Sequence, residues 1–305
     1  MIISRRFVMR SGAAFGLLGL SASRVWAQAQ LTVGGFRIDS LSDGSLVLPL
    51  GMILGDAPGA EAAEILARYG VEGDEMRPDC NLTLLRDGTN TVLFDAGSGA
   101  NFMPTAGRIN DALAAIDVTP EDITHVILTH GHPDHLWGVL DDFDDPAFPE
   151  ATYLIGRAER DYWLDPSTVD TIGPERQAFA AGALRYLGGI IDRLDTFEDA
   201  DEVLPGVQAV LSPGHTPGHM CFELRDGSDG LFLTGDAIGN HHVAFERPAW
   251  RSGADQDADL GAETRVALLD RLAGDRLPIV GFHLPAPGIG RVERQDDGYR
   301  FVAEV

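Results

Sequence analysis

Apolar segments separated by turn residues predict a chain that changes repeatedly between strands and helices. Residues 31–50 alternate between apolar and polar positions and predict a β-meander. Residues 81–85 and 91–95 flank a polar turn and predict a hairpin. A second hairpin is predicted near the C-terminus, across Asp297-Gly298.

Helical periodicity or helix-forming composition covers much of the remaining chain. Helices are predicted at 60–69, 109–116, 158–164, 174–187 and 260–273. The face that the last of these should bury consists of Ala262, Val266, Leu269 and Ala273. Gly274 should end that helix. No change in composition marks a linker, so residues 28–305 are interpreted as one domain.

Four of the apolar runs lead into residues that commonly bind metal ions. The runs 126–128, 207–211, 231–233 and 278–280 lead to His130 and His132, His215, Asp236 and His283, respectively. In α/β proteins the carboxyl ends of strands meet at a crevice where ligands bind. We therefore expect these side chains to gather at one edge of the sheets.

The stretch 129–135 is the richest of these strand ends. His130 and His132 project to the same side of an extended backbone. Pro133 suits the first position of a helix, which would turn Asp134 and His135 back toward the same point. With the other strand ends, the chain offers five imidazoles and two carboxylates. Because one tetrahedral zinc takes four ligands, seven predict two ions that share one carboxylate.

Composition narrows the range of partners. The chain has 305 residues, a formal net charge of −24, and 23 basic residues that are all arginine. An acidic surface repels phosphate backbones and anionic lipids, so we expect no nucleic-acid or membrane partner and favour a small-molecule substrate. Two cysteines do not make a disulfide framework, and Cys80 and Cys221 are expected to be buried thiols.

The N-terminal residues resemble a twin-arginine export signal. Arg5-Arg6 precede an apolar segment at 13–20, and small residues follow at Val25 and Ala27. The apolar segment is shorter than the ~20 residues that a membrane-spanning helix needs. Residues 1–27 are therefore interpreted as a signal that is removed on export, and the mature protein is expected in the periplasm.

The order of the candidate ligands resembles the dinuclear pattern of the metallo-β-lactamase superfamily over most of the chain. The resemblance implies a four-layer αββα sandwich, an α/β fold in which helices cover the outer faces of two sheets. It implies one ion at His130, His132 and His215, and a second at Asp134, His135 and His283. It also implies that Asp236 bridges the ions and that Asp95 orients ligands. His219 is expected to brace the site.

The metals determine the expected chemistry. Nitrogen and oxygen ligands accept zinc, which we expect first, as well as manganese, iron or cobalt. A bridging hydroxide, whose pKa falls toward ~7 on the metal, would attack a carbonyl or phosphoryl centre. Asp134 and Asp236 are the predicted catalytic residues. The sequence contains no Gly-x-Ser-x-Gly elbow, and neither cysteine has activating neighbours, so no separate nucleophile is expected.

Within the superfamily the sequence is most similar to methyl parathion hydrolase and its exported esterase and lactonase relatives. The segments that carry this similarity are 102–108, 161–164, 214–219 and 283–290. It implies an aromatic leaving-group pocket lined by Phe102, Trp163 and Phe179. The predicted function is hydrolysis of neutral esters, lactones or phosphotriesters with an aryl leaving group.

Other functions and states stay open at this point. Acyl-homoserine lactonases usually carry a tyrosine soon after the bridging aspartate, whereas 236–240 has none. Glyoxalase II binds glutathione through basic residues toward its C-terminus, for which only Arg291 and Arg294 are candidates. A sulfur dioxygenase on this scaffold would hold one iron. Relatives are often dimers, so a homodimer is an alternative to a monomer.

Overall fold

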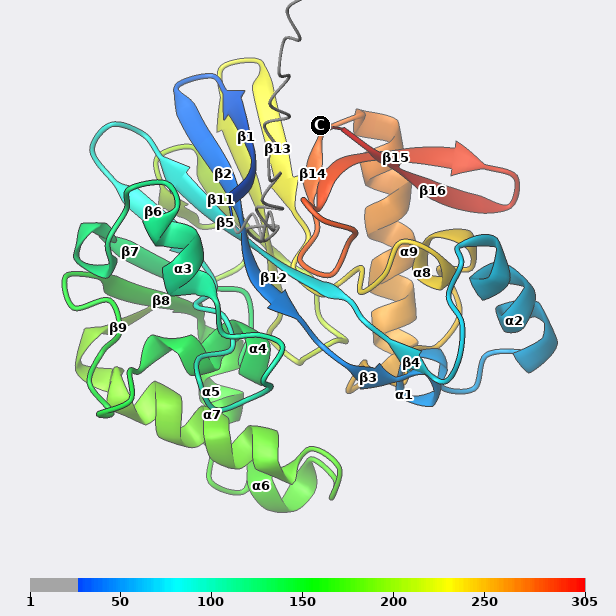
Figure 1. Cartoon of the computed structure of the whole chain (residues 1–305), viewed down its shortest axis with the longest axis horizontal. Helices are drawn as coiled ribbons and strands as arrows, with labels where there is room; N and C mark the ends of the chain where they lie inside the picture. The colour runs from blue at the N-terminus through cyan, green and yellow to red at the C-terminus, as the bar shows by residue number, and fades with distance from the viewer. Residues whose placement is uncertain (1–26, 305) are drawn as a thin grey trace, which may run out of the picture.

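Two seven-stranded sheets face each other in the computed structural model, which describes residues 27–304 (Figure 1). The strands of the first sheet have the spatial order β1-β2-β5-β6-β7-β8-β9. They are β1 (Ala27–Val33), β2 (Phe36–Ser45), β5 (Asp79–Arg86), β6 (Thr91–Phe94), β7 (His125–Leu128), β8 (Thr152–Gly156) and β9 (Leu194–Phe197). The strands from β6 to β9 pair in parallel, and the others pair antiparallel.

The second sheet follows sequence order. It contains β10 (Glu202–Leu204), β11 (Val207–Leu211), β12 (Met220–Asp226), β13 (Asp229–Leu233), β14 (Ile279–Val280), β15 (Ile289–Gln295) and β16 (Gly298–Ala303). Its only parallel pair within the described residues is β13 with β14. The predicted hairpins are confirmed as β5–β6 and β15–β16.

Helices cover the outer faces of both sheets. The helices on the side of the first sheet are α3 (Ile109–Ala114), α4 (Pro133–Leu136), α5 (Arg157–Leu164), α6 (Thr168–Thr171) and α7 (Gln177–Gly189). On the side of the second sheet lie α8 (Val243–Glu246) and α9 (Ala258–Asp275) (Figure 1). Short 3₁₀ turns occur at Pro120–Asp122, Trp137–Val139 and Ile191–Arg193.

Three apolar layers hold these elements together. Between the sheets, Phe94 of β6 packs against Phe222 of β12, with ring centroids 5.2 Å apart. Outside the first sheet, side chains of α3 and α7 pack against the strands, and outside the second sheet α9 does the same. Three layers of buried apolar side chains between four layers of backbone make an αββα sandwich, as predicted.

An additional segment links the first sheet to the second half of the molecule. Between β2 and β5 the chain forms β3 (Leu48–Pro49), α1 (Leu50–Leu54), α2 (Gly59–Arg68) and β4 (Glu75–Met76). Ile65 and Leu66 of α2 pack against Val243 of α8. The segment therefore reaches across the molecule (Figure 1), and its residues Leu48, Met52 and Ile53 line the cavity described below.

The buried face of α9 agrees with the prediction in part. Ala262 and Leu269 are buried as predicted, whereas Val266 is 36% exposed and Arg265 is buried in its place. The helix turns Arg265 inward because its guanidinium bonds to Asp255 and to backbone carbonyls. The helix also passes Gly274 and ends at Asp275, and Arg276, whose φ is 57°, caps it.

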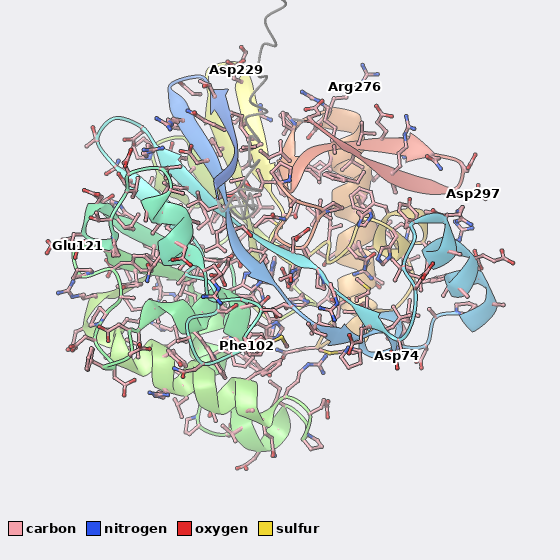
Figure 2. The ribbon with its side chains drawn as sticks, in the orientation of Figure 1. Asp74, Phe102, Glu121, Asp229, Arg276 and Asp297 are labelled. Carbon is pink, nitrogen blue, oxygen red and sulfur yellow. The ribbon has the colours of Figure 1, made fainter. Side chains whose placement is uncertain are left out.

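The surface and the thiols are as the composition suggested. Figure 2 shows the acidic residues Glu121, Asp229 and Asp297 at the periphery of the molecule. Cys80 and Cys221 are buried and unpaired, as expected.

No helix among the described residues combines the length and the apolar character needed to span a bilayer. Residues 1–26 of the predicted export signal lie outside the described residues, and that signal stays a prediction.

Candidate metal centre and cavity

Side chains from the ends of four strands meet at an edge that both sheets share. His130 and His132 follow β7 in the first sheet, and α4 begins with Pro133 at its first position, as predicted. That short helix turns Asp134 and His135 back toward the same point. The second sheet contributes His215 after β11, Asp236 after β13 and His283 after β14.

The seven residues form two groups that could each hold an ion. The three-histidine group is His130, His132 and His215. The carboxylate group is Asp134, His135, Asp236 and His283. Within each group, the ligand atoms lie within 4.8 Å of one another. All seven residues are buried, so the fold itself brings these side chains together.

Asp236 touches both groups. Its Oδ2 lies 3.3 Å from His215 Nε2 and 3.2 Å from His283 Nε2. Its Oδ1 lies 3.2 Å from His135 Nε2. A carboxylate in this position can give one oxygen to each of two ions, which is the role expected for it from the sequence.

Buried polar atoms without hydrogen bonds indicate that the centre is built for cations. His130 Nε2, His135 Nε2, Asp134 Oδ2 and Asp236 Oδ1 make no well-aligned hydrogen bond to the described chain. Each such atom costs about 1–3 kcal/mol if it stays unsatisfied. Divalent ions would satisfy all four, and imidazole nitrogens with carboxylate oxygens suit zinc, manganese, iron and cobalt. The residues present therefore fit a pair of metal ions.

The two groups differ in their electrostatics. Burial and neighbouring histidines lower the pKa values of His130 and His132 well below the ordinary range, so both are neutral ligands. Burial also opposes protonation of His135, but Asp236, Asp95 and Asp134 raise its pKa to about 10. His283 has a raised pKa for the same reasons, with Asp236 the strongest partner. In the carboxylate group, an arriving cation would displace protons.

Two residues expected to support the ligands lie beside them. Asp95 Oδ2 lies 2.8 Å from His135 Nδ1, and Asp95 Oδ1 accepts the N–H of Thr129. His219 Nε2 accepts the N–H of Asp236 at 3.0 Å, and its Nδ1 lies 2.8 Å from Ser212 Oγ. Burial lowers the pKa of His219 to about 3, so this imidazole stays neutral and holds the backbone of Asp236 in place.

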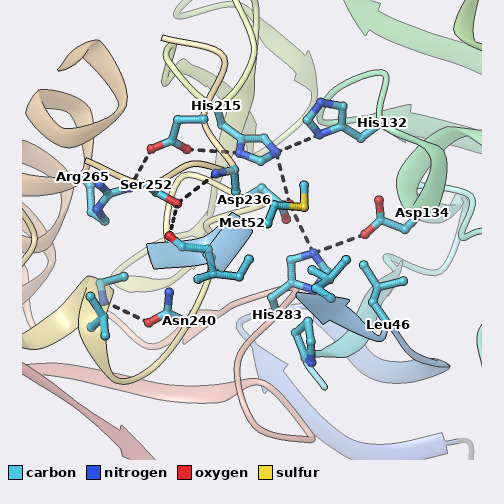
Figure 3. Close-up of a pocket in the computed structure, with 18 of the residues that line it drawn as sticks. Leu46, Met52, His132, Asp134, His215, Asp236, Asn240, Ser252, Arg265 and His283 are labelled. Carbon is cyan, nitrogen blue, oxygen red and sulfur yellow. Dashed lines mark hydrogen bonds and ion pairs between the residues drawn. The ribbon is translucent and has the colours of Figure 1, made fainter. Parts of the chain in front are cut away.

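A cavity opens above the two groups (Figure 3). Five of the seven candidate ligands line it; His130 and His135 are fully covered by their neighbours. Its apolar walls come from separate parts of the chain and comprise Leu46, Leu48, Met52, Ile53, Phe102, Phe179, Val243, Ala244 and Trp250. The floor is thus polar and the walls are apolar, which is the usual layout of a small-molecule site.

Of the three aromatic residues predicted to line the pocket, two line the cavity and one does not. Phe102 and Phe179 line the cavity, with ring centroids 6.0 Å apart in an edge-to-face arrangement. Trp163 does not line it, because its side chain is fully buried and its Nε1 donates to Glu159. The indole packs behind His132, with centroids 5.8 Å apart. The prediction for Trp163 is corrected accordingly.

Comparison with known proteins agrees with this geometry. The family model described as "Metallo-beta-lactamase superfamily" matches residues 77–283, more than half of the chain. The chain belongs to the metallo-β-lactamase superfamily. The match includes all seven candidate ligands, which supports a dinuclear metal centre. As a member of this superfamily, the protein is a metal-dependent hydrolase.

Several members of the superfamily are similar to this chain. An uncharacterized protein of Mycobacterium tuberculosis (strain ATCC 25618 / H37Rv) is 32% identical over 187 residues, 58% of this chain and 75% of the relative. N-acyl homoserine lactonase AttM of Azorhizobium caulinodans is 32% identical over 127 residues, 40% of this chain and 44% of that lactonase. This chain therefore matches less than half of the length of AttM.

Solved structures in the superfamily share the whole fold. AidC, a dizinc quorum-quenching lactonase solved with a product, has a TM-score of 0.87 and 24% identity, covering 92% of this chain and 98% of AidC. The hydrolase AbOPH has a TM-score of 0.86 and 28% identity, covering 92% of this chain and 99% of that one. Similarity to methyl parathion hydrolase is not among these findings and stays a prediction.

Three residues of this superfamily site escaped the sequence analysis. Asp255 Oδ1 lies 3.2 Å from His215 Nδ1, and Arg265 donates to Asp255 Oδ2 at 3.1 Å. Glu159 accepts hydrogen bonds from the loops that carry the three-histidine group. A signal existed for two of them, since Arg265 and Glu159 occupy inward positions of predicted helices. Asp255 lies in an irregular loop, where no periodicity marks its direction.

Proposed function

We propose that this protein hydrolyses neutral lactones and esters that carry a large apolar group. The observation that carries the proposal is the position of both ligand groups on the floor of an apolar cavity. The lactonases among its relatives support lactones as the first substrates to test. The apolar side chains of its walls suit an acyl chain or an aryl group.

The charges around the cavity favour a neutral substrate. Four arginines line it, and each is already bonded within the protein. Arg176 lies 3.5 Å from the carboxylate of Glu175 and also donates to the carbonyl of Gly253, and Arg247 donates to Glu61. Arg251 is paired with Asp259, and Arg265 with Asp255. Because these charges are compensated, an anionic group on the substrate gains little from them.

The residues on the floor can support acyl transfer to water. Two divalent ions held by the seven ligands would lower the pKa of a water toward ~7 and supply a nucleophile at neutral pH. Asp134 lines the cavity, so its carboxylate can hold a proton and pass it to the oxygen that leaves when the carbon–oxygen bond breaks. We propose Asp134 and Asp236 as the catalytic carboxylates, with Asp236 acting through both ions.

Asn240 can orient the substrate. Its Oδ1 accepts the N–H of Ala244 at 2.9 Å, which fixes the amide in the cavity wall (Figure 3). The amide nitrogen is left as a donor toward the cavity. We expect it to bond to a carbonyl or phosphoryl oxygen of the substrate, since the chain has no tyrosine at 236–240 to do so.

A second candidate function is cleavage of aryl esters and phosphotriesters. It is favoured by the edge-to-face pair of Phe102 and Phe179, because an aryl leaving group can complete such an arrangement. Phe179 also lies against His132, with ring centroids 5.7 Å apart, which would place the aryl group next to the reacting atoms.

A substrate panel tests these proposals. The purified protein would be loaded with zinc or manganese and assayed with acyl-homoserine lactones of increasing chain length, phenyl esters and paraoxon. We expect chelator-sensitive turnover, with kcat/KM rising as the acyl chain lengthens. Phe102→Leu should lower kcat/KM for aryl substrates more than for alkyl lactones, whereas Met52→Ala should affect long acyl chains more. Absence of turnover across the panel would contradict the proposal.

Metal analysis tests the remaining alternatives. Two ions per chain are expected, and one iron per chain with oxygen uptake would favour the sulfur dioxygenase.

We also propose that the protein is exported to the periplasm. Replacing Arg5-Arg6 by Lys-Lys should retain it in the cytoplasm, and unchanged export would contradict that proposal.

A further inference from the structure

Glu159 is a fully buried carboxylate that has no cationic partner among the described residues. Four donors surround it instead. Its Oε1 accepts the indole N–H of Trp163 and the N–H of Gly131, the latter at 2.9 Å. Its Oε2 accepts the hydroxyl of Thr216 and the N–H of Gly218, both at 2.8 Å. The four acceptor positions of this carboxylate are therefore filled by donors from within the protein.

The donors belong to two loops from different sheets. Gly131 lies between His130 and His132, in the loop that follows β7 of the first sheet. Thr216 and Gly218 lie directly after His215, in the loop that follows β11 of the second sheet. One side chain on α5 thus holds both loops that carry the three-histidine group.

The backbone around Glu159 is close-packed on both sides. A Cβ atom on Gly218 would lie 2.2 Å from the backbone nitrogen of Glu159. A Cβ atom on Gly131 would lie 2.5 Å from the Trp163 ring. Glycine at these two positions lets α5 approach both loops, and the contact leaves no room for water between them.

We propose that Glu159 is a positioning residue that fixes the separation of the two loops and so determines how tightly the three-histidine group binds its ion. The proposal rests on the metal centre and not on the identity of the substrate. The carboxylate group has other supports, because Asp95 holds His135 and the backbone carbonyl of Asp79 lies 2.9 Å from His283 Nδ1. The effect of Glu159 should therefore be confined to one of the two ions.

Glu159→Gln is the sharpest test, since it keeps the shape of the side chain. An amide has one acceptor oxygen, so its NH₂ group must face one of the two pairs of donors. Thr216 can rotate its hydroxyl to accept, whereas the N–H groups of Gly131 and Trp163 cannot change direction. The amide nitrogen should turn toward Thr216 and Gly218, and the loop that carries His215 should lose its anchor.

Metal affinity would be measured in two backgrounds, each with one ion site removed. His283→Ala leaves the three-histidine group, and His132→Ala leaves the carboxylate group. Zinc affinity would be determined by competition with a chromophoric chelator. We expect Glu159→Gln to weaken zinc binding roughly 10–100-fold in the first background and less than about twofold in the second. Equal losses in both, or none in the first, would overturn the proposal.

Two further variants keep the test decisive if Glu159→Gln folds poorly. Thr216→Val removes one of the four hydrogen bonds and should weaken the same site by a smaller factor. Glu150→Gln removes an exposed carboxylate from the same half of the molecule and should change neither site. In the otherwise unaltered chain, graded dialysis against a chelator should remove one ion from Thr216→Val before the other. Loss of both ions together would show that Glu159 serves general stability only.

Discussion

The three-histidine group and the carboxylate group share Asp236, yet they are built on different principles. The first consists of imidazoles only, and burial with neighbouring histidines lowers the pKa values of His130 and His132, so its affinity depends on how accurately neighbouring residues orient the rings. The second brings Asp134 and Asp236 among its ligands, so an ion there is attracted by charge as well. Nitrogen ligands suit zinc, whereas a site with carboxylates also accepts manganese. The difference indicates that geometry limits one site and charge the other.

The largest effect is expected from Asp236→Ala, which removes the contact between the groups. Asp236 Oδ2 faces His215 and His283, and Oδ1 faces His135. The variant should retain one ion or fewer and should lose more activity than the roughly 10–100-fold that loss of an outer partner costs. Elemental analysis of the purified protein measures the metal content. Asp229→Ala, at an exposed position of β13, is the matched control.

Retention of two ions in Asp236→Ala would show that the carboxylate does not bridge the groups. The comparison of the groups would then concern two independent sites.

Asp95→Asn should act mainly on the carboxylate group. His135 donates from Nδ1 to Asp95 Oδ2, which leaves Nε2 free as a ligand. An asparagine that keeps its oxygen toward Thr129 presents an N–H to His135 and favours the other tautomer, whose Nε2 carries the proton. We expect the affinity for the ion of the carboxylate group to fall roughly 10–100-fold, measured by chelator competition. The fold should survive, because asparagine tolerates the φ of 63° at this position.

Equal weakening of both ions in Asp95→Asn would contradict the separation of the groups. A second measurement, the thermal unfolding of the metal-free protein, should change little, since the amide keeps one acceptor for Thr129.

Asp255→Asn is the corresponding change in the three-histidine group, and its effect should be smaller. Asp255 Oδ1 lies 3.2 Å from His215 Nδ1, a longer contact than the 2.8 Å between Asp95 and His135. Arg265 keeps its bonds to the carbonyls of Pro248 and Trp250. We expect the zinc affinity of the three-histidine group to fall about 10-fold, which is at the lower end for loss of an outer partner. If the variant instead binds manganese and zinc more weakly at the carboxylate group, Asp255 does not support the three-histidine group.

The same contrast explains what could be predicted from the sequence. The ligands could be placed because strand ends, a two-residue histidine spacing and a proline at a helix start are local patterns, and the structure brings His130, His132 and His135 together as expected. The residues that aim them could not be placed in this way. Asp255 reaches His215 from a loop 40 positions away, and no local pattern records that contact.

Inward-facing polar residues on helices are a partial exception. Glu159 and Trp163 are four positions apart, and their side chains meet on one face of α5. Arg265 is buried at a position of α9 where the helical period calls for an apolar residue. The prediction therefore placed Val266, which is exposed, on the buried face. A charged residue at a position where the helical period requires an apolar one indicates a buried network, so both could have been marked as candidates. Similarity alone assigned Trp163 to the cavity, and packing against the ligand loop places it behind the site.

The smallest effect is expected from Thr129→Val, which tests whether anything besides Asp236 couples the groups. Thr129 Oγ1 lies 2.9 Å from both oxygens of Asp95 and 3.0 Å from His130 Nδ1. Its hydroxyl can donate to Asp95 while accepting from His130, so it joins an outer partner of one group to a ligand of the other. Valine has the same shape and removes this link, together with the 3.3 Å contact between the hydroxyl and His135 Nδ1. We expect a loss of about 1 kcal/mol in the free energy of unfolding. Both ions should be weakened by similar factors of a few-fold, and weakening of only one would show that the hydroxyl serves a single group.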